Sequence, residues 1–293
     1  MKIYGFMPVY EEADWVAYAI ENLLDFVDHL IILEGYQGPP WHFGGNRSKD
    51  GTRNILEKYK KHTKITIKRS RWSLTMNLGK ALCHKKALKI MIKMGIQEND
   101  WYFLCDADEF YTNSQKKSLK KTLANTKKDY IKIHDRMFAY NFQYYRDGIH
   151  GRFYRFKKGM RFAWYGQQPL YKNGNYYKNE SNTEALKDNP MFHYSFVKIT
   201  DREMKRRKME VKGGRRTKDI YRWIEKIYLK WTEEKAENIY RKNKKLFGTY
   251  GWFYKENKTL KKYTGPHPKI LDNHPYRHVK DMRNVKEKIV TTP

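Results

Sequence analysis

The first hundred residues alternate between short apolar runs and stretches whose apolar positions recur every three or four residues. The apolar runs predict strands over Lys2–Val9, Leu30–Leu33 and Lys64–Arg69. The periodic stretches predict helices from Trp15 to Val27, from a cap at Asp50 to about Lys61, and from a cap at Asn77 to Gly95. A fourth strand follows, and this alternation predicts an α/β fold with a doubly wound, mainly parallel sheet.

The fourth strand carries the most informative polar residues. Trp101–Cys105 is almost wholly apolar, which predicts a strand buried on both faces. Asp106, Asp108 and Glu109 follow it directly, at the end of the strand where open α/β sheets bind their ligands. Carboxylate oxygens this close together suit Mg²⁺ or Mn²⁺, which in turn would hold a diphosphate. The alternative is an acidic turn after a core strand.

The pattern changes after Phe110. Short aromatic strands are predicted over Tyr130–His134, Arg152–Phe156 and Arg161–Tyr165, followed by a hairpin at Tyr171–Tyr177 that turns on Asn173–Gly174. Beyond Thr200 the pattern is helical and basic, with 21 Lys and Arg against 9 Asp and Glu between Asp201 and Lys262. We therefore expect one domain over residues 1–200, with an added aromatic β region, and a basic, mainly helical extension over residues 201–293 packed on it.

Composition narrows the class of partner. The net charge of +29, from 61 Lys and Arg against 32 Asp and Glu, indicates that the chain binds a polyanionic partner, either nucleic acid or an anionic membrane surface. A Lys-rich background composition is the alternative. The aromatic fraction of 16% predicts an ordered chain despite a mean hydropathy of -0.94.

Location is inferred from what the sequence does not contain. No signal peptide is recognisable, and no apolar run approaches the ~20 residues that span a bilayer, so we expect a cytoplasmic protein with no transmembrane segment. Cys83 and Cys105 fall in predicted core elements, as expected for free thiols in a reducing compartment.

Six sequence features occur in an order typical of one enzyme family. They are Pro8-Val9-Tyr10-Glu11-Glu12, Glu34, Ser48-Lys49-Asp50-Gly51-Thr52, Gly79-Lys80 with His84, Asp106-Ala107-Asp108, and Met191-Phe192-His193-Tyr194. Over roughly residues 2 to 200 this order resembles the family-two-like glycosyltransferases of the GT-A fold. The resemblance implies a nucleoside-diphosphate sugar as donor, most often a UDP-sugar, and a divalent metal.

The resemblance also assigns roles to individual residues. It implies that Asp108 binds the metal directly, that Asp106 reaches the ribose or the metal, and that His193 is a further ligand. A histidine ligand favours Mn²⁺ over Mg²⁺. The nucleotide would lie along Pro8, Tyr10, Glu12, Glu34, Lys80 and His84. Some of these roles have plain alternatives: His193 as an ordinary half-buried histidine, Lys80 and Arg71 as solvated cations, and Trp164 and Tyr165 as core residues rather than a sugar platform.

The chain departs from the family pattern in two places. The loop Tyr36–Lys49 is longer than the expected turn. Amides occupy Tyr165–Pro169, where a catalytic carboxylate base is expected, which leaves Glu184 as the best candidate and Glu180 and Asp188 behind it. Asp108 and Glu184 are thus the expected catalytic carboxylates, and the stereochemical outcome stays open.

The basic extension indicates the acceptor. Lys205–Lys208 and Gly213–Arg216 lie beside Tyr221, Trp223, Tyr228, Trp231 and Tyr240. Cations among aromatic rings suit a phosphate backbone whose bases stack on the rings, which favours nucleic acid as acceptor, such as hydroxymethylated pyrimidines in DNA. The alternatives are a transferase of bacterial surface polysaccharide or lipid-linked glycan, with its basic helices on anionic membrane, and a non-catalytic nucleic-acid-binding module.

Overall fold

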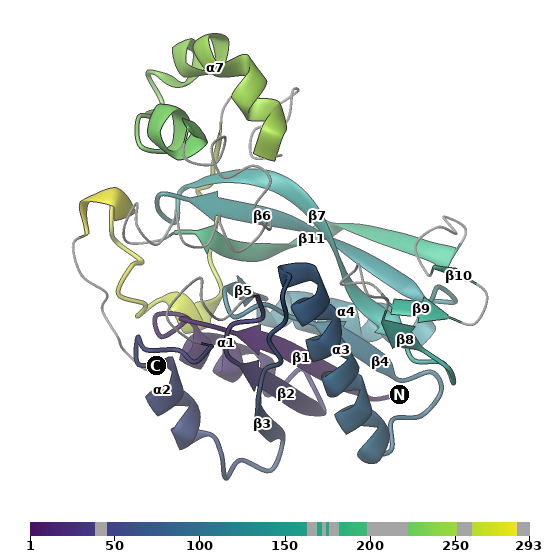
Figure 1. Cartoon of the computed structure of the whole chain (residues 1–293). Helices are drawn as coiled ribbons and strands as arrows, with labels where there is room; N and C mark the ends of the chain where they lie inside the picture. The colour runs from purple at the N-terminus through teal and green to yellow at the C-terminus, as the bar shows by residue number, and fades with distance from the viewer. Residues whose placement is uncertain are drawn as a thin grey trace.

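The computed structural model describes residues 1–38, 46–162, 169–171, 174–175, 182–197, 222–250 and 260–285. A nine-stranded mixed sheet runs through the molecule, and a small three-stranded sheet lies at one edge (Figure 1). The order of the large sheet is β3-β2-β1-β4-β7-β6-β11-β5, with β12 paired to β7.

The N-terminal half is a doubly wound α/β unit, and the four predicted strands are confirmed. The parallel strands are β1 (Ile3–Val9), β2 (His29–Glu34), β3 (Ile65–Arg69) and β4 (Trp101–Leu104). The helices between them are α1 (Val16–Leu23), α2 (Thr52–Lys58) and α3 (Met76–Lys93).

Side-chain alternation along the strands explains how the helices cover the sheet. Ile3 and Met7 of β1 pack in the core cluster that holds α1, whereas Tyr4 and Phe6 pack in the cluster that holds α3. Strands β2 and β4 alternate in the same way, because successive side chains point to opposite faces of a sheet. The sheet therefore lies between two helical layers (Figure 1).

The helices differ from those predicted in their ends and caps: α1 ends at Leu23 rather than Val27, and α2 ends at Lys58 rather than about Lys61. Thr75, not Asn77, caps α3, and its hydroxyl oxygen accepts a hydrogen bond from the Leu78 N–H at 3.3 Å. The cap of α2 is Gly51 with φ of 99°, one residue beyond Asp50. Asp50 still accepts the Thr52 N–H at 3.1 Å, so it supports the start of the helix from the position before the cap. Gly95, with φ of 82°, follows the end of α3 as predicted.

The remaining strands make the sheet mixed rather than parallel throughout. They are β5 (Glu109–Phe110), β6 (Tyr130–Ala139), β7 (Tyr144–Arg155), β11 (Thr183–Phe196) and β12 (Lys261–Lys262). Strand β7 pairs antiparallel with β4 and β6, and β5 pairs antiparallel with β11, whereas β6 and β11 are parallel. Strands β6 and β7 are longer than the predicted Tyr130–His134 and Arg152–Phe156, because Arg and His residues interrupt their apolar pattern without ending the strands. Of the predicted strand Arg161–Tyr165, the described residues Arg161 and Phe162 form a strand.

The small sheet and one helix complete this half. The strands of the small sheet are β8 (Arg161–Phe162), β9 (Pro169–Tyr171) and β10 (Gly174–Asn175). The antiparallel β9–β10 pair lies in the region of the predicted hairpin, but Gly174, expected in the turn, is the first residue of β10 and pairs with Tyr171. Helix α4 (Asn113–Asn125) was not predicted, although Thr112 and Gln115 form a capping box at its start.

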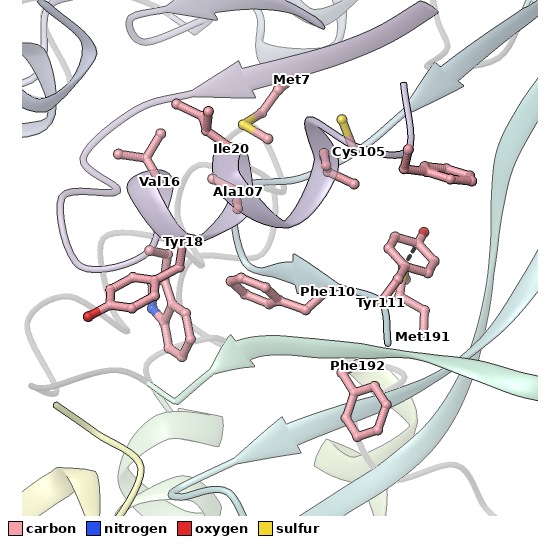
Figure 2. Close-up of a cluster of buried hydrophobic side chains, with 14 of the residues drawn as sticks. Met7, Val16, Tyr18, Ile20, Cys105, Ala107, Phe110, Tyr111, Met191 and Phe192 are labelled. Atoms are coloured by element: carbon pink, nitrogen blue, oxygen red, sulfur yellow. Dashed lines mark hydrogen bonds between the residues drawn. The ribbon is translucent and has the colours of Figure 1, made fainter. Parts of the chain in front are cut away.

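The acidic segment after β4 is anchored in the main core. Cys105 and Ala107 are buried in the core cluster that also holds Val16 and Ile20 of α1, and Figure 2 shows Phe110 of β5 below Ala107. The Asp106 and Asp108 side chains are not part of this core cluster. Cys83 and Cys105 are both buried free thiols, as predicted.

The C-terminal residues pack on the far part of the sheet. The π-helix η3 (Ile224–Tyr228) and α7 (Ala236–Tyr250) lie above β6, β7 and β11, away from α3 (Figure 1). The short helices η4 (Lys269–Leu271) and η5 (Met282–Asn284) lead back to the first unit, where His274 Nε2 lies 2.8 Å from the Asp14 carbonyl oxygen. None of the helices in these described ranges is long and apolar enough to cross a membrane.

Candidate functional site

A pocket of about 250 Å³ opens at the carboxyl ends of β1, β2 and β4. Most of the residues expected to bind metal or nucleotide line this pocket: Pro8, Tyr10, Glu12, Lys80, His84, Asp106, Asp108 and His193. Parallel strands end at one edge of the sheet, so residues far apart in the sequence meet there. Gly35, Tyr36, Gln37 and Ser195 also line the pocket and were not expected to.

Asp108 and His193 form the centre of the pocket's polar wall. Strand β5 pairs with β11 so that Glu109 faces His193, and the Tyr194 N–H donates to the Asp108 carbonyl oxygen at 2.9 Å. This pairing places His193 Nε2 3.5 Å from Asp108 Oδ1, with both side chains almost fully buried. Two ligands at right angles on one cation, each at ~2.1 Å, are ~3 Å apart, so the two groups fit a shared divalent ion.

Asp135 orients His193 from behind. Its Oδ2 lies 3.3 Å from His193 Nδ1, and its Oδ1 lies 3.0 Å from His150 Nδ1. A carboxylate on the far nitrogen of an imidazole is the usual support for a metal-binding histidine. Gly148 faces Asp135 across β6 and β7, and a Cβ there would lie under 3.0 Å from the carboxylate. Asp135 and His150 were not predicted as site residues; the signal for Asp135 was a pair of polar residues, His134-Asp135, in an aromatic strand.

Arg152 holds the other acidic residues of the wall. Its buried guanidinium pairs with Glu109 and lies 3.2 Å from Asp106 Oδ2. Burial raises the pKa of Glu109 to about 8, and Arg152 opposes that shift. The Asp106 side chain keeps 41% of its surface exposed, so it remains open to the pocket, whereas Glu109 is fully enclosed.

The charge of the wall favours a cation beside His193. Burial lowers the pKa of His193, but Asp108, Asp135 and Glu109 outweigh burial and raise it to about 10. The field that holds a proton on this imidazole would also stabilise a divalent ion, which competes with that proton. Ligand atoms of Asp106, Glu109 and His193 lie within 4.8 Å of one another, as do those of Asp135, His150 and His193. The donor set therefore suits a metal.

The opposite wall has the groups that a nucleotide needs. Tyr10 is half-buried and packs on the buried Tyr36, with ring centroids 5.2 Å apart, so the Tyr10 ring is the aromatic surface that a base could contact. Lys80 extends from the first turns of α3 into the pocket, where its ammonium group can balance phosphate charge. Pro8 lies near the end of β1, and Tyr10 and Glu12 come from the loop that connects β1 to α1.

The Ser48–Thr52 motif holds that loop in place. Ser48 Oγ accepts the Glu11 N–H at 2.9 Å, and Thr52 Oγ1 accepts the Glu12 N–H at 2.8 Å. Asp50 accepts the Ala13 N–H at 3.1 Å. These hydrogen bonds satisfy the backbone of a buried loop, so the motif shapes the nucleotide wall without lining it.

Glu34 has a different position from the one expected. It is buried, does not line the pocket, and accepts hydrogen bonds from Arg47 Nε at 2.6 Å and from the Ser48 N–H at 2.8 Å. Glu34 thus fixes the start of the Ser48–Thr52 motif.

His84 is part of an aromatic stack beneath the pocket. Its ring stacks on Phe162 at 4.5 Å and its Nδ1 lies 2.8 Å from the Tyr102 hydroxyl. Burial lowers the pKa of His84 to about 3, and Lys80 adds to the shift. The imidazole is therefore neutral and shapes the floor of the pocket.

The structure does not bring the expected base to the pocket. Glu184 lies near the start of β11, where its Oε2 accepts the Thr126 hydroxyl at 2.7 Å, while His193 lies near the other end of that strand. Asp188 is exposed on the same strand and does not line the pocket. Glu180, Trp164 and Tyr165 lie outside the described residues. Arg71 is not among the pocket-lining residues.

The aromatic residues of the basic extension are core residues. Trp223, Tyr228, Trp231 and Tyr240 are at most 7% exposed and pack with Tyr140 and Phe196. The expectation that these four rings stack on bases is therefore wrong, because their faces are covered. Tyr221 and the clusters Lys205–Lys208 and Gly213–Arg216 lie outside the described residues.

Comparison with known proteins gives weak likenesses only. No family model and no curated protein matches the chain. The crystal structure of S. aureus TarS residues 1–349 overlaps with a TM-score of 0.41 and 14% identity, covering 80% of this chain and 77% of that one. The longer S. aureus TarS structure gives 0.38 and 14%, covering 85% of this chain and 50% of that one. Mannose-6-phosphate isomerase from Helicobacter pylori gives 0.30 and 14%, covering 59% and 61%. At these TM-scores the function has to be inferred from the site.

Proposed function

We propose that the chain is a metal-dependent glycosyltransferase that moves a sugar from a nucleoside-diphosphate sugar, preferably a UDP-sugar, to a hydroxyl group of nucleic acid. A hydroxymethylated pyrimidine in DNA is the proposed acceptor. One observation carries the proposal: a single pocket at the carboxyl ends of parallel strands combines Asp106, Asp108 and His193 with Lys80 and the Tyr10–Tyr36 ring pair.

The residues divide the work of binding the donor. Tyr10 receives the base, with the buried Tyr36 packed against it, and Lys80 contributes positive charge near the phosphates. Asp108 and His193 hold Mn²⁺ or Mg²⁺, with Asp106 open to the pocket beside them. The cation, when bound, offsets the charge that develops on the diphosphate leaving group. Asp135 keeps His193 turned toward Asp108, and Arg152 limits the net charge of the acidic wall.

The base that activates the acceptor is not assigned to a described residue. Glu184 remains the candidate from sequence, but its position near Thr126 separates it from the pocket. Catalysis by this pocket therefore rests on donor binding and leaving-group stabilisation, which are the roles its residues can fill.

A metal-dependent binding experiment tests the proposal. The melting temperature of the protein should rise with Mn²⁺ and UDP together more than with either alone. Asp108→Asn should abolish that joint shift and lower sugar transfer more than about 100-fold, because one anionic ligand is lost. Asp188→Asn, an exposed carboxylate outside the pocket, is the matched control. A normal joint shift in Asp108→Asn would refute the metal role.

A second assay tests the acceptor. Labelled sugar should be incorporated into DNA that contains hydroxymethylcytosine or hydroxymethyluracil, and not into unmodified DNA. If no common nucleotide sugar gives transfer to either DNA while the joint thermal shift with Mn²⁺ and UDP is intact, the proposed acceptor is rejected and the donor site stands.

One observation favours a surface polysaccharide or a lipid-linked glycan as the alternative acceptor. Trp72 and Leu74 are 46% and 68% exposed in the loop that leads to α3, next to the exposed Arg71. Exposed apolar side chains beside a cation suit the interface of an anionic membrane. Sugar transfer to a lipid-linked acceptor, together with vesicle binding that Trp72→Ser weakens, would favour this function.

A further inference from the structure

A second hollow, of about 870 Å³, lies on the C-terminal unit and takes no part in the proposed chemistry. It is lined by residues of η3, the following turn, α7 and the segment 281–284. Four of its lining residues are exposed lysines: Lys226, Lys230, Lys235 and Lys242. Lining residues of this kind give the hollow a strongly positive potential.

The hollow is held in shape by Arg283. The guanidinium donates to the carbonyl oxygens of Tyr228 at 3.1 Å and Trp231 at 2.9 Å, and it lies 4.5 Å from the Tyr140 ring centroid. Asp281 accepts its Nε–H at 2.8 Å. This network fastens the segment 281–284 to the end of η3, so two distant parts of the chain form one lining.

The lining holds four lysines and Arg283 against one carboxylate. Asp281, the carboxylate in the lining, is already paired with Arg283. Across the described ranges, no ion pair joins Lys226, Lys230, Lys235 or Lys242 to an acidic side chain. Grouped like charges repel one another, and an anionic ligand removes that repulsion. Thr232, Asn238 and Asn284 add neutral side chains that can donate hydrogen bonds.

The shape of the hollow and the residues that line it favour one class of polyanion over the others. A membrane surface is flat on this scale and cannot enter a hollow, and the large exposed apolar residue in the lining is a single Leu229 at 37% exposure. Single-stranded nucleic acid binds through ring stacking, but the aromatic rings beneath this lining are buried. A duplex keeps its bases inside and presents its phosphates outward, so lysines without ring faces suit a duplex.

We propose that this hollow binds the phosphate backbone of duplex nucleic acid through Lys226, Lys230, Lys235 and Lys242. The proposal rests on the proposed function only in taking that duplex to be the acceptor. The two sites are structurally connected: the Tyr228 hydroxyl donates to the Phe196 carbonyl oxygen at 3.4 Å, and Phe196 follows the pocket residues His193 and Ser195 on β11.

A salt titration with a short labelled duplex tests the site. Log affinity should fall linearly with log salt, and the slope should flatten by up to about 3.6 when all four lysines are changed to Gln, because each phosphate contact contributes roughly 0.9. Affinity at low salt should fall at least tenfold. The matched control changes four exposed lysines on α2, α4 and the turn after α2, namely Lys58, Lys61, Lys117 and Lys121, to Gln, which removes the same charge elsewhere.

The outcomes separate this site from general charge and from the donor pocket. An equal loss of duplex affinity in the two quadruple variants would overturn the proposal, because only net charge would then matter. The proposal would also be overturned if changing the four lysines of the hollow to Gln abolished binding to anionic vesicles but left duplex affinity unchanged. The Mn²⁺ and UDP thermal shift should be the same in both variants and the wild type. If the wild type shows no such shift but the slopes differ as expected, the donor-site proposal fails and this site stands.

Discussion

Gly79 of α3 lies directly against the backbone carbonyl of Gln37. A Cβ at position 79 would come well under 3.0 Å from the Gln37 oxygen, so a larger residue cannot occupy this position without displacing backbone. Gln37 follows Tyr36 in the pocket wall, and Lys80 follows Gly79. The contact therefore sets the distance between the ring pair on one wall and the lysine beside it.

Gly79→Ala should weaken UDP binding and destabilise the fold. The added methyl group must push α3 or the 35–38 loop away, at a cost of about 1–3 kcal/mol in the free energy of unfolding. Calorimetric titration with UDP and urea denaturation measure the two effects. Gly95→Ala is the control, since Gly95 has open space around it and a positive φ: it should cost about 1 kcal/mol and leave UDP affinity unchanged. Equal UDP affinity in Gly79→Ala and wild type would contradict the prediction.

The sequence predicted the parallel half of the fold well because its signals are local. Apolar runs fix strands, and the acidic residues after the fourth apolar run indicated a binding site at the strand ends. Asp135 and Arg152 were not recognised as part of the site, because their importance depends on β6 and β7 pairing beside β5 and β11. Long-range pairing of this kind leaves no periodic signal. The aromatic residues of the extension were misread for a related reason, since sequence does not show which face of a ring is covered.

Glu34→Gln and Arg47→Met should weaken nucleoside-diphosphate binding to a similar degree. Both changes break the Glu34–Arg47 pair that supports Ser48, and through Ser48 the loop that carries Tyr10 and Glu12. A loss of about tenfold in affinity is expected for one charged hydrogen bond. Calorimetric titration of the diphosphate decides between two roles. If Glu34 contacts the ribose directly, Arg47→Met will leave the affinity unchanged.

Asp135→Asn should lower metal affinity about 10- to 100-fold, as expected when the support of a metal-binding histidine is removed. The amide preserves the shape of the side chain, but it no longer offers two anionic oxygens to His193 and His150. Asp129→Asn is the control, because Asp129 is another buried carboxylate whose partners, Arg155 and Lys157, lie outside the pocket lining. Both variants should lose stability, and only Asp135→Asn should need more Mn²⁺ to reach the joint thermal shift with UDP. Equal Mn²⁺ requirements in the two variants would restrict Asp135 to a structural role.

His84 should make the fold sensitive to acid. Its pKa is about 3 in the folded chain, well below the ordinary value of 6.5, because burial disfavours the imidazolium and Lys80 adds repulsion. The unfolded chain therefore takes up a proton below pH 6.5 that the folded chain refuses, so stability is full above pH 6.5 and falls as the pH drops toward 3. At pH 5 the loss from this one group is about 2 kcal/mol.

His84→Phe keeps the ring packing against Phe162 and removes the titration, at the cost of the Tyr102 hydrogen bond. Urea denaturation of both proteins at pH 7.5 and pH 5.0 gives the double difference: the variant is less stable at the higher pH, but it should lose about 2 kcal/mol less than wild type on acidification. Parallel losses in the two proteins would mean that His84 does not resist protonation in the folded state.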